Sequence, residues 1–362
     1  MRELHKVKDM IVYRDGNYNA FPIAVATDDD RIMVAFRQAP NRIRQMGNIT
    51  HVDPASRAVF VSSRDNGNSW DERPSVIYDD FLAGVHEPCI TRFKDGTLFG
   101  MFYAWKVFHK DDVNQVPSTD HLLFNRWLCR LDGMYSIRST DGGNTWDVPQ
   151  PVEGGGQAVR GIPQELEDGS LIVSTYVEPN HNGRVVILKS HDRGTSWTRV
   201  AEMEHEHYLF HEPFLYETPS GKIVAFLRSS SLRGPDPNGF SHPLFTSESL
   251  DGGITWSTPL KRNIYSPCPF HALRLNSGNV LVSFGYRYKP YGIRAFLLDG
   301  ECEGWDDIEV TELRDDGVAG DIGYTSSVQL PNGDIIIVYY YYDEPLGDRY
   351  IAGTICREDA SL

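Results

Sequence analysis

The sequence predicts a six-bladed β-propeller, an all-β fold of six four-stranded antiparallel sheets around a central axis. Two repeats predict it: one eight-residue motif occurs four times, and one strand–turn–strand pattern occurs six times. Composition agrees, because 18 Tyr, 17 Phe and 7 Trp favour strands while 32 Gly and 21 Pro imply many turns. We expect a single propeller domain over residues 1–362.

The eight-residue motif reads Ser-x-Asp-x-Gly-x-Thr/Ser-Trp, and we call each copy an Asp box. Its Asp side chain can accept hydrogen bonds from backbone N–H groups ahead of it, and its Gly can take a positive φ. The Trp ring can pack back over the turn. These features predict structural turns on the rim of the propeller, with no catalytic role for the Asp. The four copies occupy residues 63–70, 139–146, 190–197 and 249–256.

The strand–turn–strand pattern supplies the two inner strands of each blade. Most copies carry Asp-Gly, Ser-Gly or Asn-Gly at the turn, and the first carries Asp28–Asp30. A degenerate fifth box lies at Asp299 to Trp305, and an insertion at about 105–132 is expected to form a loop over one face. Residues 7–13 are expected to complete the last sheet and close the ring. The six copies span residues 23–37, 89–103, 162–176, 214–228, 272–286 and 327–341.

Bulk properties narrow the class of partner. A formal net charge of −15 argues against nucleic acid or an anionic membrane bound by bulk attraction. The five cysteines form no CxxC pair and no HExxH motif occurs, so we expect no cofactor, assign no metal ligands, and leave open whether a metal lies in the central funnel. No apolar run reaches the length of a membrane span, and the N-terminus lacks the apolar segment of a secretory signal. We therefore expect a cytoplasmic protein, and we leave its oligomeric state open.

Candidate site residues are polar side chains at the points where each blade meets the axis. A propeller brings together there the starts of its innermost strands and the loops after its second strands. Packing alone would favour Val or Leu at these positions, so a recurring polar set predicts a ligand site. The set is Arg37, His51, Asp53, His86, Glu87, Arg160, His211, Glu212, Arg228, His271, Tyr286, Arg287, Arg294, Asp321 and Tyr324.

The Asp boxes and these positions together resemble the sialidase (exo-neuraminidase) superfamily over essentially the whole chain. The resemblance implies that Tyr324, in the segment 323–333, is a nucleophile activated by Glu212 and that Asp53 is the acid/base residue. It also implies that Arg228 and Arg294 clamp a substrate carboxylate. We expect the remaining polar residues of the set to contact a carbohydrate substrate that carries a carboxylate.

One position departs from the family pattern. The first clamp Arg belongs in a motif like Arg-Ile-Pro, and here the chain reads Asn19-Ala20-Phe21-Pro22. Without that guanidinium, bidentate capture of the carboxylate of sialic acid is weakened. We therefore expect this chain to share the fold and the reaction of the family, but we have less reason to expect sialic acid as its substrate.

We weigh two alternatives against an exo-acting retaining glycosidase with a Tyr nucleophile. A lyase acting on a uronic acid would need an Arg and a His or Tyr base. The histidines at 51, 86, 211 and 271 suit that chemistry, whose product would absorb in the ultraviolet. A non-catalytic sugar-binding propeller would lack a coupled Tyr324–Glu212 pair, since a fold does not by itself imply a function.

Overall fold

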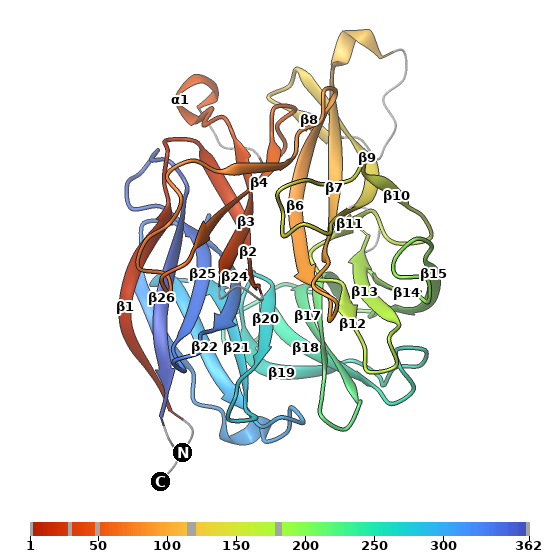
Figure 1. Ribbon diagram of the computed structural model, residues 1–362, viewed down its shortest axis with the longest axis vertical. Helices are drawn as coiled ribbons and strands as arrows, with labels where there is room; N and C mark the ends of the chain where they lie inside the picture. Colours follow the sequence, from red (N-terminus) through yellow and green to blue (C-terminus); the bar gives the residue numbers. More distant parts are fainter. Residues whose placement is uncertain (1–2, 28–30, 48–50, 114–120, 178–182, 360–362) are drawn as a thin grey trace.

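The strands of the protein form a ring of antiparallel sheets. The computed structural model describes residues 3–27, 31–47, 51–113, 121–177 and 183–359. Within these ranges the strands form six sheets, each built around four strands, and the innermost strands of successive sheets contact one another. The last of these strands contacts the first, so the ring closes. Figure 1 shows the sheets following one another around the molecule in sequence order. The predicted six-bladed propeller is confirmed.

Blades one to three come from the first half of the chain, and in each the strands run in sequence order from the axis to the rim. A short helix, α1 (Ile43–Met46), lies between the second and third strands of blade one. The strands of blade one are β2 (Tyr18–Ala26), β3 (Ile32–Ala39), β4 (Arg57–Ser63) and β5 (Ser75–Tyr78). Those of blade two are β6 (Ala83–Arg92), β7 (Leu98–His109), β8 (His121–Leu123), β9 (Trp127–Ser139) and β10 (Gln150–Val152). Those of blade three are β11 (Ala158–Val159), β12 (Gln164–Glu165), β13 (Leu171–Tyr176), β14 (Val185–Ser190) and β15 (Thr198–Met203).

Blades four to six repeat the arrangement, and the last takes its outer strand from the N-terminus. In blade six, β1 (Leu4–Tyr13) pairs antiparallel with β26, from Leu4 opposite Glu358 to Tyr13 opposite Ile351. Figure 1 shows β1 beside β26. The strands of blade four are β16 (Tyr208–Glu217), β17 (Ile223–Ser231), β18 (Pro243–Ser249) and β19 (Leu260–Tyr265). Those of blades five and six are β20 (Phe270–Arg274), β21 (Val280–Tyr286), β22 (Tyr291–Leu298), β23 (Thr311–Gly317), β24 (Gly323–Gln329), β25 (Ile335–Tyr341) and β26 (Tyr350–Glu358).

The Asp boxes form the self-satisfied turns that the motif predicts. In the fourth box, Oδ1 of Asp251 accepts a hydrogen bond from the backbone N–H of Thr255 at 2.9 Å, and Ser249 Oγ accepts one from the N–H of Gly253 at 2.9 Å. The other three boxes repeat these bonds. The Thr255 hydroxyl also donates to Asp251, and because this bond and the one from the Thr255 N–H favour the charged carboxylate, the pKa of Asp251 falls to about 2. The box Asp residues are turn formers.

Each box also joins its blade to the blade before it. The box glycine has a positive φ, and a Cβ added there would touch the core of the preceding blade: Gly253 lies on Ile172 of blade three, and Gly194 on Phe99 of blade two. The box tryptophans follow the same rule, since Trp256 packs against the cluster shared by blades three and four. Glycine is therefore required twice at this position, by the backbone angle and by the close approach.

The degenerate fifth box keeps this turn with one extra residue. Asp299 Oδ1 accepts the N–H of Glu303 at 3.0 Å, and Trp305 donates its indole N–H to the carbonyl of Cys302 at 2.8 Å. Trp256 makes the equivalent bond to Gly253 at 2.9 Å. The short helix η3 (Trp305–Asp307) follows the turn.

The insertion in blade two is more regular than expected. Instead of a loop, β7 (residues 98–109) and β9 (residues 127–139) pair over their whole length as one long hairpin. The short strand β8 pairs with β9. The 3-10 helix η1 (Lys110–Asp112) ends the first arm. Two parts of these predictions, residues 114–120 and the Asp28–Asp30 turn, lie outside the described residues.

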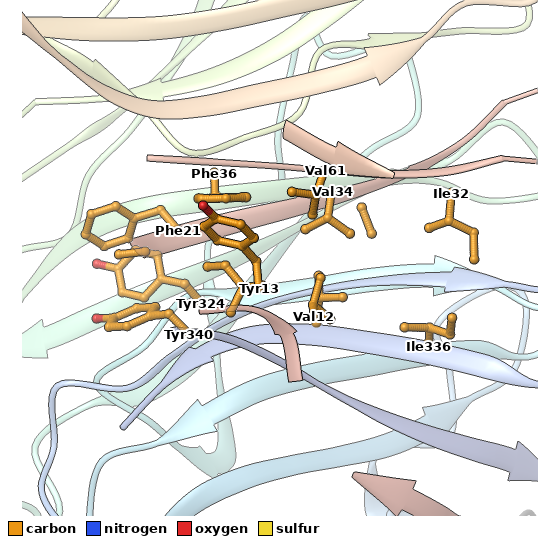
Figure 2. Close-up of a cluster of buried hydrophobic side chains, with 14 of the residues drawn as sticks. Val12, Tyr13, Phe21, Ile32, Val34, Phe36, Val61, Tyr324, Ile336 and Tyr340 are labelled. Atoms are coloured by element: carbon orange, nitrogen blue, oxygen red, sulfur yellow. The ribbon is translucent and has the colours of Figure 1, made fainter. Parts of the chain in front are cut away.

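The core lies between the blades. Among the described residues, six clusters of buried apolar side chains each join two neighbouring blades. Figure 2 shows the cluster between blades six and one, where aliphatic residues such as Val34 and Ile336 occupy one end. Phe21, Tyr324 and Tyr340 gather at the other end. This aromatic end adjoins the candidate site.

Candidate active site

In four blades, the same kind of β-bulge turns a side chain toward the axis. The innermost strands of blades one, two, four and six each contain a β-bulge, and in each bulge a residue other than Gly has a positive φ. These residues are Phe21 (58°), Glu87 (47°), Glu212 (38°) and Tyr324 (57°). A bulge re-aims one side chain out of the alternation of a strand, and such strained residues cluster at functional sites.

Tyr324 of blade six and Glu212 of blade four meet across the start of blade five. The Tyr324 hydroxyl donates a hydrogen bond of 2.5 Å to Oε1 of Glu212, and both residues are buried. Oε2 of Glu212 forms an ion pair with Arg228, whose Nη1 also lies 3.2 Å from the Tyr324 hydroxyl. Register explains part of this geometry, because Arg228 in β17 stands directly opposite His211 in β16, next to Glu212.

Burial and charge set the protonation of this pair. Burial raises the pKa of Tyr324 well above its usual value, and the charge of Glu212 raises it further. Burial also opposes ionisation of Glu212, but the positive charge of Arg228 and the hydrogen bond from Tyr324 outweigh it and lower the pKa of Glu212. The resting pair is therefore a neutral phenol that donates to a carboxylate, the arrangement of a nucleophile beside its base.

Two more guanidinium groups face the Tyr324 ring. Those of Arg160 and Arg287 lie 5.1 and 5.2 Å from its centroid. Arg160 is fixed by the carbonyls of Pro22, Tyr324 and Thr325. Arg287 is fixed by the carbonyl of Ile322 at 2.9 Å and by the hydroxyl of Tyr340 at 2.6 Å. With Arg228, these residues make the surroundings of Tyr324 strongly cationic.

The structure places Arg294 away from this group. Arg294 lies in the third strand of blade five, where it forms an ion pair with Glu312 and donates to the carbonyl of Arg314. Its guanidinium covers the ring of Tyr286 at 4.8 Å, and no contact among the described residues joins it to Tyr324. Arg287, directly after the second strand of blade five, faces Tyr324 instead, as does Arg228 within the second strand of blade four. These contacts favour Arg287 for the role that sequence resemblance gave to Arg294.

Asp53 is buried in an ion pair that the sequence did not indicate. Arg42 binds both oxygens of Asp53, and the N–H of Ala55 donates to Oδ1 at 2.9 Å. This pair must open before Asp53 can exchange a proton with a substrate. It borders an apolar cavity of about 250 Å³ that is lined by Arg42, Met46, Val52, Asp53, Pro54, Val107, Leu123, Phe124 and Trp127.

Phe21 directly follows Ala20, which stands where the family's Arg-Ile-Pro motif has its arginine. Its ring is fully buried and packs on the rings of Tyr324, Tyr340, His51 and His86 at 4.8, 5.4, 5.3 and 4.7 Å. Figure 2 shows Phe21, Tyr324 and Tyr340 side by side. The site is aromatic here, where a cation was expected from resemblance alone.

Arg37 lies close to that substitution in the fold. It stands opposite Ala20 in the neighbouring strand and is fully buried, with its guanidinium 5.5 Å from the Tyr18 ring. Within the described part of the chain its three guanidinium nitrogens have no hydrogen-bond partner, and burial lowers its pKa. Arg37 is thus a buried cation beneath the site.

Three of the four candidate histidines are buried and neutral. Burial lowers the pKa of His86 well below its ordinary value and those of His211 and His271 to about 3. His86 stacks on Tyr103 and has Glu87 3.7 Å away, while His211 bonds Ser230 and His271 bonds Ser326. These groups are poor proton carriers at neutral pH.

His51 differs from them in exposure and in partner. Its side chain is 40% exposed, and its Nε2 lies 3.2 Å from Oδ1 of Asp321. Asp321 also accepts hydrogen bonds from Tyr18 at 2.9 Å, Tyr340 at 3.0 Å and Arg349 at 2.8 Å. The sequence placed His51 and Asp321 in the same region, but 270 residues separate them and no motif indicated that they pair.

Among the described residues, one group of metal-ligating type is close enough to share an ion: Glu3, His5 and Asp359, all exposed at the paired chain ends. It belongs to a different part of the fold from Tyr324. No helix in the described ranges is long and apolar enough to cross a membrane.

A six-bladed ring, Asp-box turns and a buried Tyr–Glu pair at its axis define a sialidase-like propeller. Residues 58–337 match the family of the BNR repeat-like domain, and the chain belongs to that family. A solved structure of a protein of unknown function from Dyadobacter fermentans DSM 18053 is 33% identical, with 98% of this chain and 99% of that chain covered and a TM-score of 0.87.

Two named enzymes are more distant. A leech intramolecular trans-sialidase, solved with 2,7-anhydro-Neu5Ac, is 14% identical, with 98% of this chain and 70% of that chain covered and a TM-score of 0.66. The xyloglucanase Xgh74A of Acetivibrio thermocellus is 26% identical over 200 residues, which are 50% of this chain and 22% of that enzyme. The match thus spans about a fifth of the curated relative. These likenesses establish a propeller fold that glycoside hydrolases use.

Proposed function

We propose that the protein is an exo-acting, retaining glycoside hydrolase that acts on an acidic sugar with Tyr324 as the nucleophile. The observation that carries the proposal is the buried hydrogen bond from Tyr324 to Glu212, with Arg228 bound to the same carboxylate. A non-catalytic sugar-binding propeller has no need of such a pair, and burying it costs free energy.

The geometry supports a double displacement. In the first step the Tyr324 oxygen attacks the anomeric carbon and its proton passes to Glu212. The bond to the leaving group breaks, and the leaving oxygen takes up a proton from an acid group. In the second step water attacks the anomeric carbon, and the Tyr324 oxygen leaves and recovers its proton from Glu212. Both bond changes occur at the Tyr324 oxygen, and the guanidinium groups of Arg160, Arg228 and Arg287 surround the Tyr324 side chain.

A carboxylate on the substrate fits these charges. Guanidinium groups bind carboxylates well, and a phenol repels a substrate carboxylate less than an Asp or Glu nucleophile does. Because the first clamp Arg of the family pattern is absent next to Phe21, we expect a smaller acidic sugar, such as a hexuronic acid, to be preferred over sialic acid.

The test is a screen of 4-methylumbelliferyl sialosides and hexuronides with the wild-type chain and with Tyr324→Phe and Glu212→Gln. We expect hydrolysis with net retention, and a loss of at least about 10²-fold in kcat for both variants. Tyr265→Phe is the matched control, because it removes a Tyr–Asp hydrogen bond on the rim of blade four. Inversion at the anomeric carbon, or full activity of Tyr324→Phe, would overturn the proposal.

A uronate-directed lyase is the second candidate, and the His51–Asp321 pair favours it, since β-elimination needs a base. The same screen, extended to uronate-containing oligosaccharides and read by ultraviolet absorbance, separates the two. An absorbing, unsaturated product without net uptake of water would identify the lyase.

A further inference from the structure

We propose that His51, held by Asp321, is the proton donor to the leaving group and takes the place that Asp53 has in the family pattern. The inference rests on the proposed glycosidase function and adds a second catalytic residue to it. Two independent features carry it: the geometry of the His51–Asp321 pair, and the engagement of Asp53 elsewhere.

Asp321 is rigidly placed to orient an imidazole. Its two oxygens accept hydrogen bonds from Tyr18, Tyr340 and Arg349, at 2.8 to 3.0 Å, and His51 approaches one of the same oxygens. A buried carboxylate bonded to one ring nitrogen fixes the tautomer of histidine and stabilises the imidazolium. With Nε2 bonded to Asp321, Nδ1 is the atom that exchanges the proton.

Among the candidate histidines, His51 alone combines an acidic partner fixed in this way with solvent access. Its side chain is 40% exposed, whereas His86, His211 and His271 are 3–6% exposed. Its ring packs on Phe21 at 5.3 Å, and Phe21 packs on Tyr324 at 4.8 Å. One buried phenyl ring therefore separates His51 from Tyr324, which places the exposed imidazole next to the nucleophile's surroundings.

Asp53 is less suited to this step. Arg42 binds both of its carboxylate oxygens, and the backbone N–H of Ala55 donates to one of them. Donation by Asp53 would require that pair to open, whereas His51 can donate where it stands.

The charges around His51 keep its partner ionised. Burial opposes the charge on Asp321, but His51, Arg287 and Arg349 lower its pKa well below the usual range. The titratable and charged groups that face this region are Tyr18 of β2, Arg37 of β3, His86 of β6, Arg287 after β21, Tyr340 of β25 and Arg349 before β26.

The proton balance closes over the two steps. The His51 imidazolium gives its proton to the glycosidic oxygen as the bond to the anomeric carbon breaks. The neutral imidazole then takes a proton from the water that attacks the anomeric carbon and releases Tyr324. His51 ends each cycle protonated and Asp321 charged throughout.

The test compares His51→Ala, Asp321→Asn and Asp53→Asn on two glycosides of the sugar found by the screen, one with a 4-nitrophenyl and one with a methyl leaving group. His191→Ala, exposed in the third Asp box, is the control. For His51→Ala we expect kcat on the methyl glycoside to fall by about 10²–10⁴-fold and that on the 4-nitrophenyl glycoside by far less. Sodium azide should restore turnover and yield a glycosyl azide. Asp321→Asn should show a weaker form of the same dependence.

Two results would overturn the inference: an equal loss on both glycosides without azide rescue, or this pattern in Asp53→Asn instead of His51→Ala. If the wild-type chain cleaves no glycoside, the proposed function fails, and nitrogen NMR of the imidazole then decides the pairing separately. The Nε2–H tautomer of His51 should give way to a mixture in Asp321→Asn. A tautomer that does not respond to this substitution counts against the pair itself.

Discussion

The ring of Phe21 packs edge-on against that of Tyr324, with centroids 4.8 Å apart, one residue after Ala20, where the sialidase pattern has an arginine. Both residues have a positive φ within a β-bulge of an innermost strand, so blades one and six use one backbone device for two different side chains. The same kind of bulge thus places an apolar ring in blade one and a phenol in blade six.

Truncating Phe21 should destabilise the protein strongly. Phe21→Ala removes a fully buried ring that contacts four other rings, and such cavities cost about 3–5 kcal/mol in the free energy of unfolding. Phe21→Leu, which fills more of the space, should cost less. Urea unfolding followed by Trp fluorescence measures both. Phe81→Ala is the control, because Phe81 is 99% exposed and should show no change. Equal stability of Phe21→Ala and wild type would mean that the ring is not packed as described.

The second prediction concerns which arginine holds an acidic substrate. Arg287→Met should raise KM for a hexuronide by about 10-fold or more and leave KM for the matching neutral glycoside nearly unchanged, because one charge-assisted contact is lost. Arg294→Met should affect both substrates alike, since Arg294 is engaged by Glu312 and the Arg314 carbonyl. Steady-state kinetics on the two glycosides measure the difference. The reverse ranking would return the role to Arg294.

Sequence was sufficient for the repeats and insufficient for pairings between blades. The Asp boxes and hairpins are local, so their turn chemistry could be read from neighbouring residues, and they fixed the number of blades. Tyr324, Glu212 and Arg228 followed from a resemblance in blade position. The Arg42–Asp53 and His51–Asp321 pairs depend on how segments outside the repeat cross the axis, and nothing periodic encodes that. The contact of Arg287 rather than Arg294 with Tyr324 has a related cause, because the side that a residue faces depends on which strand of the blade carries it.

The third prediction is a change in acid sensitivity. His271 has a pKa of about 3 in the folded protein, because burial disfavours its charged form, against about 6.5 in the unfolded chain. Between these values the unfolded state binds a proton that the folded state does not, so folding loses about 1.4 kcal/mol for each pH unit of acidification. His271→Gln removes this pH-dependent contribution to the free energy of unfolding. Its stability relative to wild type should therefore improve as pH falls from about 6.5 to about 4.5.

Urea unfolding at several pH values measures how the free energy of unfolding changes with pH in wild type and in His271→Gln. His191→Gln is exposed and serves as the control, with an expected slope like that of wild type. Parallel curves for His271→Gln and wild type would show that the buried imidazole is already charged, or that water reaches it.

The last prediction separates the two reasons why an Asp box needs glycine: the positive φ and the close approach to the preceding blade. Gly253 has φ +91°, and an added Cβ would overlap the Ile172 side chain of the preceding blade. Gly221, at the hairpin turn of the same blade, has φ +81° with nothing within 4 Å. Gly221→Ala should therefore cost only the backbone strain, about 1 kcal/mol. Gly253→Ala should cost about 1–3 kcal/mol more, because overpacking is added. Chemical denaturation gives both values. Equal costs would mean that the blades do not meet through the box turn, and a larger cost for Gly253 would make that turn a joint between blades three and four.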